Sequence, residues 1–151
     1  MSKFLEAAFV EANCSITESS ETNNQLTKTY RVSGTRTDLA VTSISISPAA
    51  PAANSTVNVA VTVANQGTVS INAAGYLDVW ANQSTTAVCG AEGNAWADIG
   101  SLAAGVTKTI TVQVPVGAAG SKVMRVFADS WCETVEAVEI NNQLTKNYAV
   151  Q

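Results

Sequence analysis

The sequence contains no histidine, so the side chain that most often serves as a general base in enzymes is missing. It has no glycine-rich motif of the kind that cradles phosphate, and no apolar run long enough to span a bilayer. Paired carboxylates support glycoside hydrolysis when they flank a cleft, but here they cluster in one short stretch beside a turn. We therefore expect a protein that is not an enzyme and does not insert into a membrane.

Charge is scarce as well, because charged residues make up only 13% of the 151 residues. The eight Lys and Arg residues are scattered singly and the net charge is -4, so nucleic acid is not an expected partner. The chain is instead rich in Ser, Thr, Asn, Gln and Gly, a mixture typical of secreted β-rich proteins. We expect an extracellular or cell-surface location, although the opening residues MSKFLEAAFVEANC lack a clean signal peptide.

What the sequence does contain is an internal repeat. Residues 14–32 and 132–150 share eleven of nineteen residues at a constant offset of 118. A self-match at a fixed spacing indicates a repeat protein. We therefore divide the chain into residues 1–36, the tail of a preceding repeat that is able to act as a donor strand, and residues 37–151, which form one complete unit.

Apolar residues alternate along the complete unit, which is the pattern of strands with one buried face. Strands are predicted at 41–47, 57–63, 75–81, 107–116, 123–128 and 144–150, and the polar stretch 82–100 is predicted as an irregular excursion. Together with the Pro, Gly and Asn turns, these strands favour an all-β fold, an antiparallel sandwich of about seven strands. Residues 3–12, KFLEAAFVEA, are strong helix formers, so there we predict strand in the later half when docked, and helix or disorder when free.

Three cysteines is an odd number, which implies one internal pair and one further thiol. The repeat makes Cys14 the counterpart of Cys132. Because no histidine is present to complete a metal or catalytic site, we predict a disulfide between Cys89 and Cys132. It would close a loop of about forty residues and stabilise the fold by roughly 3 to 4 kcal/mol. Cys14 is then either buried and inert, or bonded to a neighbouring unit.

Several stretches of the complete unit carry a family resemblance: DLAVTSISISP at 38–48, VNVAVTVANQGT at 57–68, LAAG at 102–105, and the ending VFADSWCETVEAVEINNQLTKNY. The most specific part is the pattern formed by Asp129, Glu136, Glu139, Asn141 and Asn142, which Glu18, Glu21, Asn23 and Asn24 repeat. In these residues the unit resembles the CARDB family, the cell-adhesion-related domain found in bacteria and archaea. The resemblance implies an immunoglobulin-like sandwich of seven strands, exposed outside the cell, usually in tandem arrays, with structural or adhesive roles and no general catalytic activity.

The same five residues, Asp129, Glu136, Glu139, Asn141 and Asn142, supply the hard oxygen ligands that Ca²⁺ prefers. In an alternating strand Glu136 and Glu139 would point to opposite faces, so a shared ion requires a bend between them. The alternative is a polar turn in which the asparagine side chains bond the local backbone. No cofactor is required by the sequence, and calcium stands as an open candidate.

Sequons at Asn13, Asn54 and Asn82 are candidates for glycosylation and indicate exposed positions. Trp80, Trp96 and Trp131 either form a sugar-binding platform or pack in the core. Core packing is the more ordinary explanation, above all for Trp131 beside Cys132.

Two functions are consistent with these features. In the first, a structural protein polymerises head to tail, because the surplus N-terminal segment pairs with an open sheet edge of another copy. The residues expected at that contact between subunits are Cys14, Asn23, Asn24, Leu26, Lys28, Tyr30 and Val32. In the second, the chain is a module of a tandem-repeat surface adhesin that binds glycans or proteins, and the segment is the end of the preceding repeat. The expected partners are copies of the same chain or adjacent repeats.

Overall fold

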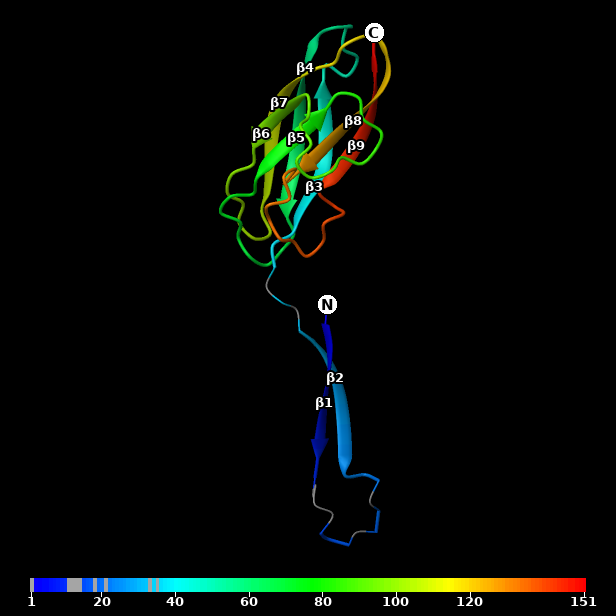
Figure 1. Cartoon of the computed structure of the whole chain (residues 1–151), viewed down its shortest axis with the longest axis vertical. Coiled ribbons are helices and arrows are strands. Elements are labelled where there is room, and N and C mark those ends of the chain that lie inside the picture. The colour runs from blue at the N-terminus through cyan, green and yellow to red at the C-terminus, as the bar shows by residue number, and fades with distance from the viewer. Residues whose placement is uncertain (1, 11–14, 18, 21, 33, 35) are drawn as a thin grey trace. The chain divides into compact units, whose positions relative to one another are not determined.

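A computed structural model describes residues 2–10, 15–17, 19–20, 22–32, 34 and 36–151 of the chain. The chain divides into two compact units, Met1–Gly34 and Thr35–Gln151. Figure 1 shows the first unit as a hairpin and the second as a β-sandwich. The described residues contain no helix with the length and apolar character that crossing a membrane would need.

The larger unit consists of two antiparallel sheets (Figure 1). One sheet has the order β3–β4–β7, from strands Leu39–Ser47, Thr56–Asn65 and Thr107–Pro115. The other has the order β6–β5–β8–β9, from Ala95–Asp98, Tyr76–Trp80, Gly120–Ala128 and Gln143–Val150. Three strands packed against four make an immunoglobulin-like sandwich, so the predicted all-β fold is confirmed.

The core lies between the two sheets and comes from the alternating apolar residues. On β4 the inward side chains are at most 1% exposed, and they are Val57, Val59, Val61 and Val63. They join a single cluster to which every strand of the sandwich except β6 contributes, with Leu77 from β5, Met124 from β8 and Val150 from β9 among its members. Burial of this apolar surface is the main force that holds the sheets together, and it is complete within residues 39–150.

The segment 82–100 was predicted to be irregular throughout, and this is wrong for its second half, where β6 pairs with β5. On β6, Ala95 and Ala97 pack against the core while Trp96 and Asp98 are exposed. The alternation is therefore present, but its inward residues are alanines, which give a weak signal for a strand. The first half runs over the outer face of the four-stranded sheet, where Ala87 packs with Trp80 and Phe127.

The smaller unit is a hairpin of β1, Ser2–Phe9, and β2, Gln25–Val32. Its register equals that of β8 and β9 after adding 118 to each residue number: Ser2 pairs with Val32 as Gly120 pairs with Val150, and Phe9 pairs with Gln25 as Phe127 pairs with Gln143. The next main-chain hydrogen bond is repeated too, because Val10 N donates to Asn24 O and Ala128 N donates to Asn142 O, both at 2.9 Å. The repeated segment is thus a two-stranded hairpin and not a final strand alone.

Two expectations for the first residues need correction. Strand β1 runs from Ser2 to Phe9, so the helix or disorder expected for the free segment is wrong, and strand is not confined to the later half. Pairing with β2 satisfies the backbone groups on one side of β1, and such non-local pairing overrides helix propensity.

Candidate functional site

The hairpin β1–β2 has a strand edge that its counterpart in the sandwich does not have. Within the part of the chain that the structure describes, β1 pairs with β2 alone, whereas β8 pairs with both β9 and β5. An open edge carries main-chain N–H and C=O groups that another strand is able to satisfy. Two strands by themselves also bury little apolar surface, so such a hairpin is only marginally stable in water.

Side chains predicted at a subunit contact lie on this hairpin. Leu26 is 76% exposed, although its counterpart Leu144 packs against the core of the sandwich. Asn23 and Lys28 are exposed, and Asn24 is half-buried. Three members of the predicted set fall outside the described residues or side chains: Cys14, Tyr30 and Val32. Leu26 is thus an apolar residue of the hairpin that has no core to pack against, whereas its counterpart Leu144 has one.

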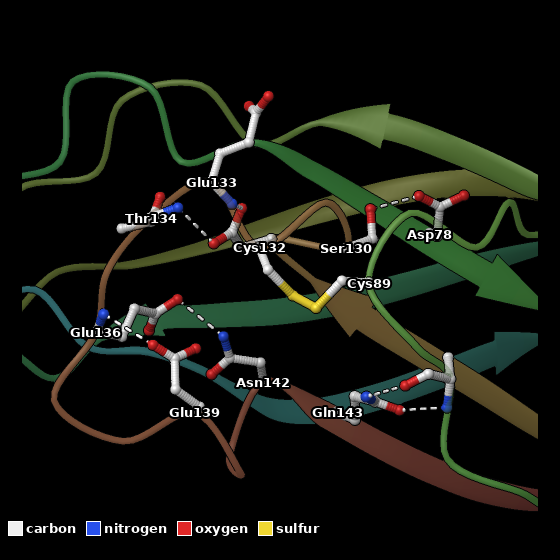
Figure 2. Close-up of a disulfide and its surroundings, with 12 residues drawn as sticks. Asp78, Cys89, Ser130, Cys132, Glu133, Thr134, Glu136, Glu139, Asn142 and Gln143 are labelled. Carbon is white, nitrogen blue, oxygen red and sulfur yellow. Dashed lines mark hydrogen bonds between the residues drawn. A yellow bond between two sulfur atoms is a disulfide. The ribbon is translucent and has the colours of Figure 1, made fainter.

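The predicted disulfide between Cys89 and Cys132 is present, with Cα atoms 5.6 Å apart. It joins the 82–94 segment to the turn that follows β8 (Figure 2). A main-chain hydrogen bond of 2.9 Å from Gly90 N to Ser130 O lies at the same junction. The excursion is therefore fixed to the outer face of the four-stranded sheet by a covalent bond and a hydrogen bond.

Asp129 holds the turn that carries Cys132. Its side chain is fully buried, and its two oxygens accept hydrogen bonds from Glu133 N at 3.1 Å and Thr134 N at 2.8 Å. Burial raises the pKa of the Asp129 carboxyl, while the two backbone hydrogen bonds act in the opposite direction. The role of this carboxylate in the structure is to accept main-chain donors of the turn.

Glu136 connects the last loop to the first strand of the sandwich. It is only 4% exposed, and its carboxylate accepts hydrogen bonds from Leu39 N and, at 2.8 Å, from Asn142 Nδ2. Glu139 Oε1 in turn accepts from Glu136 N at 2.9 Å (Figure 2). The pKa of Glu136 is raised to about 7, mainly by burial; the nearby charges of Glu139 and Asp129 also raise it, and the two hydrogen bonds lower it.

Four residues of the calcium prediction are therefore neighbours, namely Asp129, Glu136, Glu139 and Asn142, and the chain bends between Glu136 and Glu139 as a shared ion requires. The fifth, Asn141, donates its Nδ2 to Asp38 Oδ1 at 2.9 Å. The carboxylate oxygens already accept N–H groups, so a calcium ion would have to displace those donors. Two buried oxygens have no hydrogen-bond partner, Oδ1 of Asn141 and Oδ1 of Asn142. Across the described ranges, no group of three or more His, Cys, Asp or Glu is arranged to hold a metal ion. The asparagine side chains donate to Asp38 and Glu136 and not to the local backbone, so the expected polar turn is not seen in that form, and calcium binding stays a prediction.

The structure gives the exposure of two of the three sequon asparagines and of all three tryptophans. Asn54 and Asn82 are exposed, and Asn13 lies outside the described residues. The prediction that Trp131 packs in the core is wrong, because it lies in a surface turn and is 49% exposed. Trp80 is buried at 7% exposure, and Trp96 is 64% exposed.

Comparisons with known proteins agree with this architecture. The CARDB family model matches residues 36–146. The crystal structure of the CARDB domain of a Pyrococcus furiosus protein, in complex with di-metal ions, is similar with a TM-score of 0.61 at 21% identity, over 79% of this chain and 97% of that one. The solution structure of the same domain gives a TM-score of 0.55 at 22% identity, over 76% of this chain and 94% of that one.

A β-glucosidase involved in saponin metabolism from intestinal bacteria gives a TM-score of 0.51 at 16% identity, over 76% of this chain but only 16% of the enzyme. No curated protein matches the chain. At these identities the solved structures show a shared fold and carry no function over to this chain.

Proposed function

The chain belongs to the CARDB family, and on that premise we propose that it is a non-enzymatic, extracellular structural protein that assembles head to tail through its hairpin β1–β2. The family supplies the sandwich, and the hairpin supplies the means of assembly. Supporting the extracellular location is the disulfide between Cys89 and Cys132, since such bonds persist in oxidising compartments.

The observation that carries this proposal is the identical register of β1–β2 and β8–β9. A hairpin with that register is shaped to lie in a CARDB sheet, yet in the described part of the chain it belongs to a separate sheet of two strands. When the hairpin adds as a strand to the sheet of another copy, its open edge gains hydrogen-bond partners and its exposed Leu26 is buried. Such a contact is head-to-tail and does not close, so its repetition gives a filament.

The hairpin has two ways to engage a neighbour, and one residue position decides between them. If it replaced β8–β9 of the other copy, Glu6 would occupy the position of Met124, which is fully buried in the core. An unpaired carboxylate in an apolar core is costly. We therefore propose that the hairpin adds along an edge of the neighbouring sheet and leaves the strands of that sandwich in place.

Sedimentation velocity over a range of concentrations tests the assembly, with negative-stain microscopy of the largest species. We expect the full chain to form concentration-dependent oligomers, and a chain that lacks residues 1–34 to remain a monomer. Leu26→Asp should also prevent assembly. The matched control is Val88→Asp, because Val88 is 72% exposed on the sandwich and has no place in the proposed contact.

A full-length chain that stays monomeric at every concentration would contradict the proposal, above all if the amides of β1 and β2 exchange freely with solvent. Loss of assembly in both Leu26→Asp and Val88→Asp would also count against it, because the effect would then come from added charge and not from the hairpin.

The match between residues 14–32 and 132–150 at an offset of 118 also favours a second function, that of a module in a tandem-repeat surface adhesin. In that case β1–β2 are the last two strands of a preceding repeat on the same polypeptide. Further copies at a spacing of 118 residues in a longer parent sequence, together with a monomeric full chain, would support the adhesin over the filament.

A further inference from the structure

An open pocket lies on the outer face of the four-stranded sheet. Its volume is about 520 Å³, which is within the range of sites that hold small molecules. Three aromatic residues line it, Tyr76, Trp96 and Trp131, together with the carboxyl-bearing residues Asp78 and Glu92.

The sheet register places most of these residues together. Asp78 on β5 pairs with Trp96 on β6, and Tyr76 lies two residues before Asp78, so all three face away from the core. Trp131 arrives from the turn beside Cys132, and Glu92 from the segment that follows Cys89. The disulfide thus joins the two segments that complete the pocket.

Asp78 fixes these segments from beneath the pocket surface. Its side chain is 3% exposed, and its Oδ1 accepts a hydrogen bond from Gly93 N at 2.8 Å. Its Oδ2 accepts from Ser130 Oγ at 2.5 Å (Figure 2). Gly93 approaches so closely that an added Cβ would lie 2.7 Å from Val79 O. The pocket is therefore built by specific contacts and is not a gap between loose loops.

The aromatic rings form a corner. The ring centroids of Tyr76 and Trp96 are 5.4 Å apart and the ring planes are at 90°. Trp96 and Trp131 keep 64% and 49% of their surface exposed, unusually much for large aromatic side chains. Each ring face carries negative electrostatic potential, and faces set at right angles surround a rounded group better than a flat one.

The charges around the pocket select for a cation. Asp78 and Glu92 add negative charge to the potential of the rings, and no Lys or Arg is among the pocket-lining residues that the structure describes. The whole chain is also acidic, with a net charge of -4. The ring planes of Tyr76 and Trp96 are perpendicular, so the two rings do not form one flat platform on which a pyranose stacks.

From the aromatic corner and its two carboxylates we infer that the pocket binds an organic cation, namely a quaternary ammonium group on a small molecule. Methyl groups of the cation fill the corner between Tyr76 and Trp96, and its charge is stabilised by the ring faces and by Glu92. This site goes beyond the proposed assembly, because none of its residues lies on the hairpin.

Titration of the full chain with choline chloride tests the inference, followed by tryptophan fluorescence and by amide chemical shifts, with sodium chloride at equal concentration as the blank. The reference ligand is 3,3-dimethylbutan-1-ol, which has the same shape as choline but carries no charge. We expect saturable binding of choline, shifts centred on residues 76, 96 and 131, and affinity for the alcohol about tenfold weaker.

Variants locate the binding within the pocket. Trp96→Ala and Glu92→Gln should each weaken choline binding several-fold, while thermal melting confirms that both variants remain folded. Glu133→Gln is the matched control, because Glu133 is an exposed carboxylate that does not line the pocket. It should bind choline as the wild type does.

Four results would overturn the inference. They are equal affinity for choline and for its neutral analogue, tighter binding of a neutral disaccharide such as cellobiose, no saturable binding of choline at tens of millimolar, and equal weakening by Glu92→Gln and Glu133→Gln. The first two describe an apolar or a sugar-binding pocket, and the last describes only the overall charge of the protein.

Discussion

Glu136 illustrates at the scale of single residues how a buried carboxyl links distant parts of the chain. Its oxygens accept donors from Leu39 on the first strand of the sandwich and from Asn142 in the last loop. Desolvation of the charged form accompanies these contacts, and the pKa of about 7 lies above the ordinary value of 4.5. The stability of the sandwich therefore depends on the protonation of this residue.

The sign of that dependence can be tested. Between pH 4.5 and 7 folded Glu136 keeps a proton that the unfolded chain has released, so its contribution to stability is complete below 4.5 and is lost as the pH rises through 7. Burial raises the pKa of Asp129 as well, which acts in the same direction. Urea unfolding should give a free energy of unfolding lower at pH 8 than at pH 5, by at most about 3 kcal/mol.

Glu136→Gln should remove most of this difference, because the amide does not titrate. Glu133→Gln should retain it, because Glu133 is exposed. A Glu136→Gln chain whose unfolding free energy varies with pH as in the wild type would show that other groups govern the dependence.

The sequence predicted which residues would gather around Glu136, but not what they do there. The Asp, Glu and Asn types suggested metal ligands or a polar turn, whereas the structure uses the carboxylate oxygens of Asp129, Glu136 and Glu139 as acceptors for backbone N–H groups. One of those donors, Leu39 N, is 97 residues away from Glu136, and the sequence pattern contains no sign of that contact. The sequence analysis named Trp96 and Trp131 but did not predict the strand that places Trp96 at the pocket, although Ala95-Trp96-Ala97 carries a weak alternation.

At the scale of elements, local patterns predicted strands wherever β-branched residues alternate with polar ones. Strands β3, β4 and β7 are of this kind, and all lie within a few residues of their predicted positions. Strand β6 was missed because small alanines face its core side. For residues 3–12 we expected strand only in the later half when docked, and helix or disorder when free, because these residues favour helix locally. The true state of β1 follows from pairing with β2, across a long connecting segment, and local propensity does not report such pairing.

The 82–94 segment, by contrast, depends on one covalent element. Cys89 and Cys132 are 43 residues apart, so opening their bond frees a long loop in the unfolded chain. A variant with both cysteines changed to serine should lose roughly 3 to 4 kcal/mol of unfolding free energy. The strands should remain, since the main core does not include the disulfide. Fluorescence of Trp80 should shift to longer wavelength, because the segment that covers it loosens.

A reducing agent provides the control for this change. It should bring the wild type to the stability of the double variant and leave the variant itself unaltered. Equal stability of the wild type with and without reductant would show that the disulfide contributes little to the folded state.

At the scale of the whole molecule, the two compact units differ in how complete they are. The sandwich has its own terminal hairpin β8–β9 and a core that lies within residues 39–150. The hairpin β1–β2 repeats only the last two strands of that architecture. The repeat in the sequence predicted a surplus segment, but the match from Cys14 to Val32 covered β2 alone. The pairing of β1 became visible only in the backbone register, because few residues of β1 equal those of β8.

This asymmetry predicts that the sandwich folds independently of the first unit. A chain without residues 1–34 should have a free energy of unfolding within about 0.5 kcal/mol of that of the full chain, because the deletion removes none of the buried core. The two chains are compared at a concentration where the full chain is monomeric. Removal of residues 120–151 should instead abolish cooperative unfolding, since Met124 and Val126 are fully buried between the sheets. Differential scanning calorimetry measures both effects. A large loss of stability in the 1–34 deletion would mean that the surplus hairpin completes its own sandwich, and that it is not held in reserve for another copy.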